Sequence, residues 1–265
     1  MHTKEEKLAA FARLLDVMDE LREKCPWDRE QTYQSLRPNT IEETYELSDA
    51  LLRQDEKEIC KELGDVLLHV VFYSKIGSET GSYDIADVCN QLCDKLIFRH
   101  PHVWSPSDAA GTHADTAEQV LSQWEQLKTR ETDGNKRVLS GVPQTLPSMI
   151  KAYRIQEKAH GVGFDWEEPQ QVWNKVREEI AEFEQEVASC DADRRAREFG
   201  DLIFSLINAA RLYGINPDNA LELTNRKFIN RFNYLEDHTL KQGRQLSELT
   251  LQEMEQIWQE SKRLY

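Results

Sequence analysis

The feature that most constrains this chain is an internal repeat that places the same four acidic positions in each half. In the first half they follow the pattern E-x2-E-x15-E-x2-D, at Glu43, Glu46, Glu62 and Asp65. The second half repeats the pattern 136 positions later, at Glu179, Glu182, Glu198 and Asp201. The segment Leu63-Gly64-Asp65 also aligns with Phe199-Gly200-Asp201. We therefore predict two copies of one folding unit.

Two further blocks recur in the same order and strengthen the case for duplication. A lysine followed four positions later by an arginine occurs at Lys95 and Arg99, and again at Lys227 and Arg231. A tryptophan followed four positions later by a lysine occurs at Trp124 and Lys128, and again at Trp258 and Lys262. Three separate blocks in one order favour a true duplication over a chance match.

Long segments with apolar residues at helical spacing, and few glycines or prolines, predict helices almost throughout. In the first half we predict helices over residues 4–24, 39–54, 56–78, 83–98 and 116–130. In the second half we predict them over residues 146–159, 169–189, 191–213, 217–237 and 250–264. No segment alternates long enough to predict a strand. The expected fold is all-α, with helical-bundle modules at 1–130 and 146–265 joined by a linker at 131–145.

The charge balance limits the partners that we expect. The chain has a net charge of −15, which repels nucleic-acid backbones and anionic membranes over most of the surface. Its longest apolar stretch, around residues 66–73, is too short to span a bilayer. The N-terminus has no apolar signal segment, and the five cysteines include no CxxC pair. We expect a cytoplasmic protein with reduced thiols and with no nucleic-acid or membrane partner.

The acidic quartets lie beside expected core stripes. In helix 169–189 the predicted stripe comprises Val172, Val176, Ile180, Phe183 and Val187. In helix 191–213 it comprises Phe199, Leu202, Ile203, Leu206 and Ile207. Residues three apart share a helix face, so packing these stripes together would gather the four flanking carboxylates. Because crowded carboxylates repel one another and prefer a compensating cation, an all-oxygen set of this kind suits Mg²⁺, with Mn²⁺ as a possible substitute.

Other interpretations of these residues stay open. The quartets are also compatible with an exposed acidic helix face. A di-iron site is set aside because it requires the Glu-x-x-His spacing on two helices, and this chain has that spacing once, at Glu157 and His160. The Lys–Arg pairs suit phosphate binding but equally suit salt bridges. The two tryptophans at 124 and 258 suit stacking on a nucleobase, or packing in a core.

Several motifs resemble the bacterial MazG family over nearly the whole chain. In the first half they are Cys25-Pro26-Trp27-Asp28, Glu42-Glu43-Thr44-Tyr45-Glu46, Glu62-Leu63-Gly64-Asp65 and Arg99-His100-Pro101-His102-Val103. In the second half they are Gly163-Phe164-Asp165-Trp166, Glu178-Glu179-Ile180-Ala181-Glu182, Gly200-Asp201 and Lys227-Phe228-x-x-Arg231-Phe232. The resemblance implies a dimeric all-α enzyme that uses Mg²⁺ to hydrolyse nucleoside triphosphates, NTPs and dNTPs alike, to the monophosphate and pyrophosphate.

The resemblance also assigns roles to residues. It implies that Glu179, Glu182, Glu198 and Asp201 hold the metal, with a water activated beside them. The implied substrate contacts are Lys175, Glu178, Arg194, Arg197, Lys227, Arg231 and Lys262, with Trp258 facing the base. Arg197 stands where this family often has another acid, which leaves the number of metal ions open. The possible second site comprises Glu43, Glu46, Glu62, Asp65, Lys95, Arg99, Trp124 and Lys128.

The repeat itself suggests which copy is active. Shifted by the repeat offset, Lys175 aligns with Asn39 and Arg194 aligns with Glu58. The first copy thus keeps its carboxylates and lacks two expected phosphate cations. We predict that the second copy is the principal active site. The alternative functions are a nucleotide sensor without hydrolysis and a helical dimerisation or regulatory module.

Overall fold

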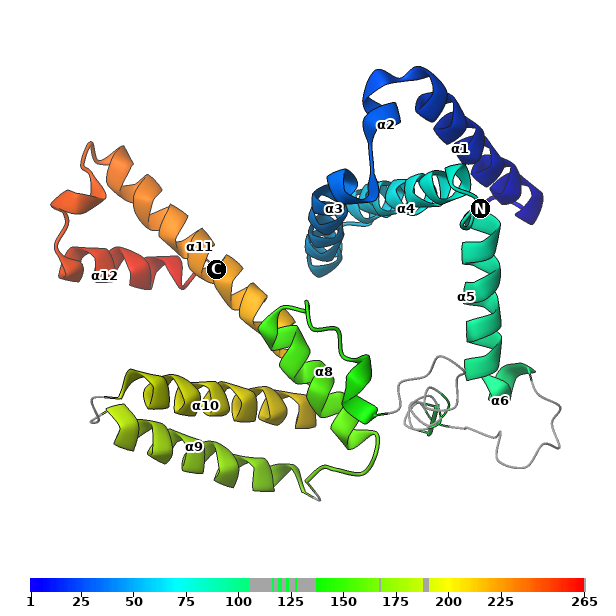
Figure 1. Cartoon of the computed structure of the whole chain (residues 1–265). Helices are drawn as coiled ribbons and strands as arrows, with labels where there is room; N and C mark the ends of the chain where they lie inside the picture. Colours follow the sequence, from blue (N-terminus) through cyan, green and yellow to red (C-terminus); the bar gives the residue numbers. More distant parts are fainter. Residues whose placement is uncertain are drawn as a thin grey trace. The chain divides into compact units, whose positions relative to one another are not determined.

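The computed structural model describes residues 1–104, 137–166, 168–187 and 191–264, together with positions 116, 119, 120, 123 and 127. Every regular element in this described part is a helix, which confirms the all-α fold class. The chain divides into two compact units, Met1–Ala114 and Asp115–Tyr265 (Figure 1). Most of the predicted helix 116–130, and residues 131–136 of the predicted linker, lie outside the described residues.

The first unit begins with a long helix that the sequence predicted residue for residue. Its helices are α1 (Lys4–Lys24), α2 (Pro26–Glu30), α3 (Tyr33–Arg53), α4 (Glu56–Glu79), α5 (Ile85–Arg99) and α6 (Pro101–Trp104). Helix α1 starts at a capping box in which the Thr3 side chain accepts from the Glu6 N–H. The predicted start of the next long helix at residue 39 was wrong, because Thr32 caps α3 at its N-terminus and Pro38 lies inside the helix.

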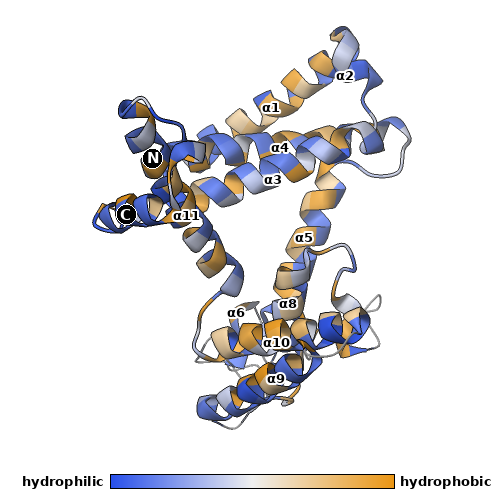
Figure 2. Cartoon of the chain, turned by 90° about the vertical axis from the view of Figure 1, so that its left-hand side faces the viewer, coloured by the Kyte–Doolittle hydropathy of each residue, from blue (hydrophilic) through white to orange (hydrophobic). Residues whose placement is uncertain are grey.

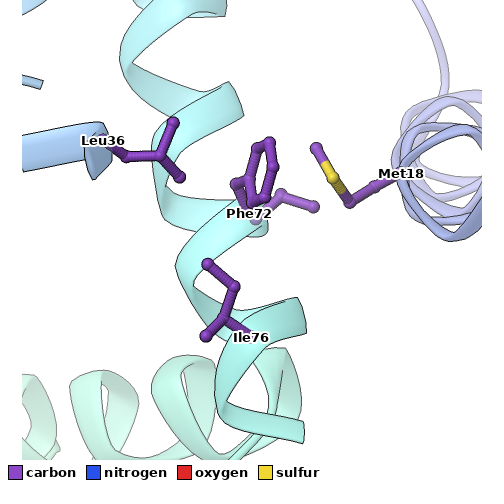
Figure 3. Packing of buried hydrophobic residues seen from close by; sticks show 5 residues of the cluster. Met18, Leu36, Phe72 and Ile76 are labelled. Atoms are coloured by element: carbon purple, nitrogen blue, oxygen red, sulfur yellow. The ribbon is translucent and has the colours of Figure 1, made fainter. Parts of the chain in front are cut away.

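The core of the first unit lies where α1 and α3 meet α4. It comprises Met18, Leu36, Val71, Phe72 and Ile76, all buried. Figure 3 shows the Phe72 ring of α4 between Leu36 of α3 and Met18 of α1. This aromatic side chain is 2% exposed and connects the three helices through one apolar cluster.

The second unit repeats the order of a lone helix followed by a helical hairpin. Its α-helices are α8 (Ser148–His160), α9 (Val172–Val187), α10 (Ala192–Leu212), α11 (Pro217–Lys241) and α12 (Leu251–Ser261). Short 3₁₀ turns lie at η1 (Val138–Gly141), η2 (Pro169–Gln171) and η3 (Leu246–Glu248). Val172, Val176 and Ala209 form a small core between α9 and α10. A second cluster, Leu235, Leu249 and Ile257, joins α11 to α12.

The helical hairpins α3–α4 and α9–α10 are the repeated structural element. The second helix of each begins at an aspartate cap, Asp55 or Asp191, whose side chain accepts two backbone N–H groups. These two residues are separated by the repeat offset of 136 positions. Helices α1 and α8, which end at residues 24 and 160, obey the same offset. The duplication seen in the sequence is therefore present in the structure.

The predicted core stripes of the second unit were partly wrong. Val172, Val176 and Ile207 are buried as expected. Five other stripe members are 38–53% exposed: Ile180, Val187, Phe199, Ile203 and Leu206. A hairpin of two helices buries only one line of side chains on each, and Glu179 occupies that line in α9. Figure 2 shows hydrophobic residues, in orange, along α10.

None of the helices in the described part of the chain combines the length and the hydropathy that a membrane span requires.

Candidate metal centre

Each helical hairpin brings three of its four acidic side chains together. In the second unit, carboxylate oxygens of Glu179, Glu182 and Glu198 all lie within 4.8 Å of one another. In the first unit, Glu43, Glu62 and Asp65 form the corresponding group within the same distance. Both groups combine residues from the two helices of one hairpin, and three oxygens at this separation can share one small hard cation.

The fourth members of the quartets lie beside these groups. Asp201 lines a cavity that also reaches Glu179. Glu46 lines an open depression on the first unit together with Glu62.

One glutamate in each group is buried, so its negative charge is unfavourable unless a cation compensates it. Glu179 is 5% exposed and Glu62 is 3% exposed. Glu62 Oε1 accepts from Lys61 Nζ at 2.7 Å, and its Oε2 has no hydrogen-bond partner among the described residues. An ionised oxygen buried without a partner is unfavourable, and a metal ion would satisfy it. The donor set and this unpaired oxygen therefore fit a divalent cation bound by oxygen ligands.

The crowding changes the acidity of one glutamate in each unit. Desolvation, together with the charges of Glu182, Asp201 and Glu179, raises the pKa of Glu198 above its usual value. In the first unit, desolvation and the charges of Asp65, Glu46 and Glu62 raise the pKa of Glu43. Both pKa shifts indicate that negative charge is crowded within each acidic group. A bound cation there would favour the ionised form of Glu198 and of Glu43.

Lys175 lies at the edge of the second acidic group. Its Nζ forms ion pairs with Glu179 at 2.7 Å and with Glu178 at 2.9 Å. The hydrogen bonds that Lys175 donates to these two carboxylates raise its pKa, so the side chain stays cationic. The first unit has Asn39 at the aligned position and lacks this charge. The nearby cation of the first unit is instead Lys61, which aligns with Arg197.

The remaining predicted cations of the hairpin are exposed. Arg194 Nε lies 3.3 Å from Asp191, the residue that caps α10. Arg197 is also exposed on α10. Both can reach a ligand at the N-terminal end of that helix, and their role in binding stays a prediction.

The predicted residues of α11 and α12 lie elsewhere in the second unit. The Trp258 ring packs on Phe228 of α11, with centroids 5.0 Å apart. Lys227 and Arg231 lie on α11, which packs against α8, α10 and α12, and Lys262 caps the end of α12. All described residues that line the cavity beside Glu179 fall between Leu139 and Arg211. Substrate contacts from α11 and α12 therefore stay predictions.

The corresponding residues of the first unit are similarly dispersed. Lys95 and Arg99 lie on α5, which packs against α4 and α6 and has no buried residue within the part of the chain that the structure describes. Trp124 and Lys128 lie outside the described residues.

A cavity of about 700 Å³ adjoins the acidic group of the second unit. It is bounded by α8, by the turn at residues 161–166, and by α9 and α10. Apolar side chains form much of its wall, including Ile155, Phe164, Trp166 and Phe204. Its size falls in the range of about 300–1,000 Å³ typical of small-molecule sites.

A partly buried ion pair holds another part of the cavity wall. Arg211 Nη2 donates to Asp165 Oδ1 at 2.6 Å, and His160 Nδ1 lies 2.6 Å from Asp165 Oδ2. Burial opposes ionisation of Asp165, but hydrogen bonds from Arg211 and the Trp166 N–H, with the nearby positive charge, outweigh it and lower its pKa. The ion pair attaches the 161–166 turn to α10 and holds that side of the cavity.

The sequence analysis did not single out Gln156, Asn208 or Arg211, all of which line the cavity. The repeat could have indicated part of this site, because two cavity residues align with different residue types in the first copy. Asn208 aligns with Phe72 and Ser205 aligns with His69.

The aligned region of the first unit is filled by side chains. Phe72 occupies the core there, and His69 Nδ1 lies 3.1 Å from Thr40 Oγ1. Thr40 Oγ1 also lies 2.6 Å from the Tyr73 hydroxyl. Desolvation lowers the pKa of His69, against the opposing charge of Asp65, so the ring is neutral at pH 7.

Comparison with known proteins identifies relatives of nearly equal length. Residues 31–104 and 167–235 match the family model of the MazG nucleotide pyrophosphohydrolase domain, and each segment contains one acidic quartet. The chain is 40% identical over 258 residues to a nucleoside triphosphate pyrophosphohydrolase of Escherichia coli (strain K12), covering 95% of this chain and 96% of that protein. It is 39% identical over 255 residues to the nucleoside triphosphate pyrophosphohydrolase/pyrophosphatase MazG of Thermotoga maritima, covering 95% of each chain.

Proposed function

The chain belongs to the MazG nucleotide pyrophosphohydrolase family, and we propose that its second unit hydrolyses nucleoside triphosphates to nucleoside monophosphates and pyrophosphate. The reaction joins a water oxygen to the α-phosphorus and breaks its bond to the oxygen that bridges the α- and β-phosphates. We propose both NTPs and dNTPs as substrates.

The observation that carries this proposal is that the acidic quartet of the second unit borders the cavity. Glu179 and Asp201 belong to the quartet and also line the cavity, so a ligand in the cavity lies directly beside the carboxylates. A nucleoside triphosphate has the two matching parts, because its base and sugar suit an enclosed, largely apolar cavity and its phosphates require cations. Lys175, which also lines the cavity, provides one cation at the boundary.

The residues that would hold a divalent cation are Glu179, Glu182, Glu198 and Asp201. Mg²⁺ or Mn²⁺ bound there would neutralise phosphate charge and lower the pKa of a coordinated water. The chain itself supplies the rigid hairpin that fixes Glu179 in the helix interface, and Lys175 holds a positive charge beside it. Arg194 and Arg197 on α10 extend the positive charge available to the triphosphate.

We propose that the first unit is not the principal site of hydrolysis. Its acidic group has the same hairpin framework, but Asn39 and Glu58 replace the cations at 175 and 194. In addition, Phe72 and His69 occupy the positions that border the cavity in the second unit. A metal ion can be held there by Glu43, Glu62 and Asp65 without the surroundings that a nucleotide requires.

A product assay tests the reaction directly. Purified protein incubated with each NTP and dNTP and with Mg²⁺ is expected to release pyrophosphate and monophosphate, and EDTA is expected to abolish release. Chromatographic separation of the nucleotides identifies the bond that is broken. Release of orthophosphate and diphosphate would contradict the assigned bond, and no turnover with any triphosphate would favour the nucleotide-sensor function.

We also propose that the protein is a homodimer. The exposed apolar residues of α9 and α10, including Ile180, Phe199, Ile203 and Leu206, form a face that one hairpin cannot cover. Two such faces packed together would complete a four-helix bundle.

The mass in solution checks this proposal. At micromolar concentration, light scattering during gel filtration is expected to give twice the chain mass. Leu206→Asp places a charge on the apolar face and is expected to shift the protein toward monomer, while Asp193→Asn, at an exposed polar position of the same helix, is expected to leave the dimer intact. A monomeric wild-type protein at tens of micromolar would contradict the dimer.

A further inference from the structure

Gln156 is the one cavity residue whose buried side chain has an unused hydrogen-bonding atom in the described part of the chain. It lies on α8 and is 5% exposed. Its Nε2 donates to the backbone oxygen of Phe204 on α10 at 2.8 Å, and its Oε1 has no partner among the residues that the structure describes. Because a backbone carbonyl can only accept, this hydrogen bond fixes which end of the amide is the free oxygen.

A buried acceptor without a partner is unfavourable by about 1–3 kcal/mol, so it is expected to meet a donor in the functional state. Gln156 lines the cavity, and a ligand in that cavity can supply the donor. The Phe204 carbonyl holds the amide in one orientation, so the oxygen is fixed before the ligand arrives.

Helix α10 presents a second amide with a fixed orientation. Asn208 Oδ1 accepts from Arg211 Nε at 3.1 Å and from Arg211 Nη2 at 2.9 Å. Arg211 is in turn held by Asp165. Because its Oδ1 already accepts from Arg211, the Nδ2 group of Asn208 can donate a hydrogen bond to a ligand. The cavity thus combines an acceptor at Gln156, a donor at Asn208 and the aromatic rings of Phe164 and Trp166.

We propose that this cavity binds the nucleobase of the triphosphate and that Gln156 Oε1 accepts a hydrogen bond from an N–H group of the base, an inference that rests on the proposed function. The natural bases all carry such an N–H beside a ring or carbonyl acceptor, so one acceptor and one donor recognise a base without choosing a single one. Gln156 is a specificity-determining residue that excludes ligands lacking this donor.

The duplication supplies an internal comparison for this assignment. In the first unit the position of Gln156 is held by Glu20, which is exposed and forms an ion pair with Lys24. The position of Asn208 is held by Phe72, which packs on Met18 and Leu36 (Figure 3). The acidic group recurs in both units, whereas the paired amides belong to the second unit alone. This pattern is expected if the amides serve the base and the carboxylates serve the metal.

The test compares ATP with purine riboside triphosphate, which has the purine ring but no N–H donor. We expect wild-type kcat/KM to be about tenfold lower for purine riboside triphosphate, the worth of one hydrogen bond at a desolvated site. In Gln156→Met the ratio of kcat/KM for ATP to kcat/KM for purine riboside triphosphate is expected to fall to about one, because the acceptor is gone. Glu20→Met, the matched change in the first unit, is expected to leave the ratio and the turnover unchanged.

Binding gives a readout that is independent of catalysis. The Kd for α,β-methylene-ATP, measured by calorimetry, is expected to rise about tenfold in Gln156→Met and to stay constant in Glu20→Met. If wild-type protein hydrolyses ATP and purine riboside triphosphate equally well, the base assignment is overturned while the proposed function stands. Loss of discrimination in Trp258→Ala, with discrimination retained in Gln156→Met, would place the base at α12 instead. No turnover of any triphosphate by the wild-type protein would overturn the proposed function itself.

Discussion

The double substitution Glu179→Gln/Glu182→Gln is expected to reduce turnover of nucleoside triphosphates by about 10³-fold or more. Glutamine keeps the shape of each side chain but removes two of the negative charges that would hold the cation. Loss of about 4 kcal/mol of transition-state stabilisation corresponds to a factor of this size. The measurement is kcat for pyrophosphate release at saturating Mg²⁺, with the fold checked by circular dichroism.

The repeat provides a matched control for this experiment. Glu43→Gln/Glu46→Gln makes the same chemical change at the aligned positions of the first unit and is expected to keep most of the turnover. Equal losses in the two variants would show that both units contribute to hydrolysis. Retained activity in the second-unit variant would refute the assignment of the principal site.

The substitution Phe72→Ala is expected to lower the free energy of unfolding of the first unit by about 3–5 kcal/mol, the range for removing a buried aromatic ring. The ring joins α1, α3 and α4 in one cluster and is the largest of its five buried side chains. Chemical denaturation followed by far-ultraviolet circular dichroism measures the change. The expected result is an earlier transition for part of the helical signal, because the second unit has its own core.

An exposed leucine on α1, another helix that contributes to this core, gives the comparison for this prediction. Leu8 is 61% exposed, and Leu8→Ala is expected to change the free energy of unfolding by about 0.5 kcal/mol or less. If Phe72→Ala were no more destabilising than Leu8→Ala, the packing shown in Figure 3 would not describe the core of the first unit.

Much of the fold could be predicted from the sequence because helix signals are local. Capping residues and apolar spacing determine where α1 and α4 begin, and both lie close to their predicted starts. The short helices α2 and α6 were missed because five and four residues carry too little periodic signal. The predicted start of α3 was late, because Pro38 lies inside the helix and a proline there removes only one helical hydrogen bond.

The apolar stripes were harder to predict because spacing identifies a helix face but not its partner. Phe199 and Leu206 have the spacing of core residues, yet a single chain leaves them exposed. Spacing also placed Glu179 on a flank, whereas the close approach of α9 to α10 buries it.

The cavity could not be predicted at all from local signals. Its decisive contact joins Gln156 to Phe204 across 48 positions, and its wall depends on an ion pair between Asp165 and Arg211 that spans 46. Comparison of the two copies could have pointed to it, because polar residues at 205 and 208 replace the larger His69 and Phe72. A repeat thus carries information on function at the positions where its copies differ.

Phe72 packs in the core of the first unit, whereas the second unit has a cavity at the aligned region. This difference implies that the two units differ in their free energy of unfolding. A cavity of about 700 Å³ forgoes the dispersion contacts that Phe72 makes in the other copy, and an unpaired amide oxygen adds to the deficit. A nucleotide at 100 times its Kd would return about 2.7 kcal/mol to the second unit alone. Substrate supply would then govern how often that unit opens to proteases, and the cellular lifetime of the enzyme would follow the abundance of the molecules that it consumes.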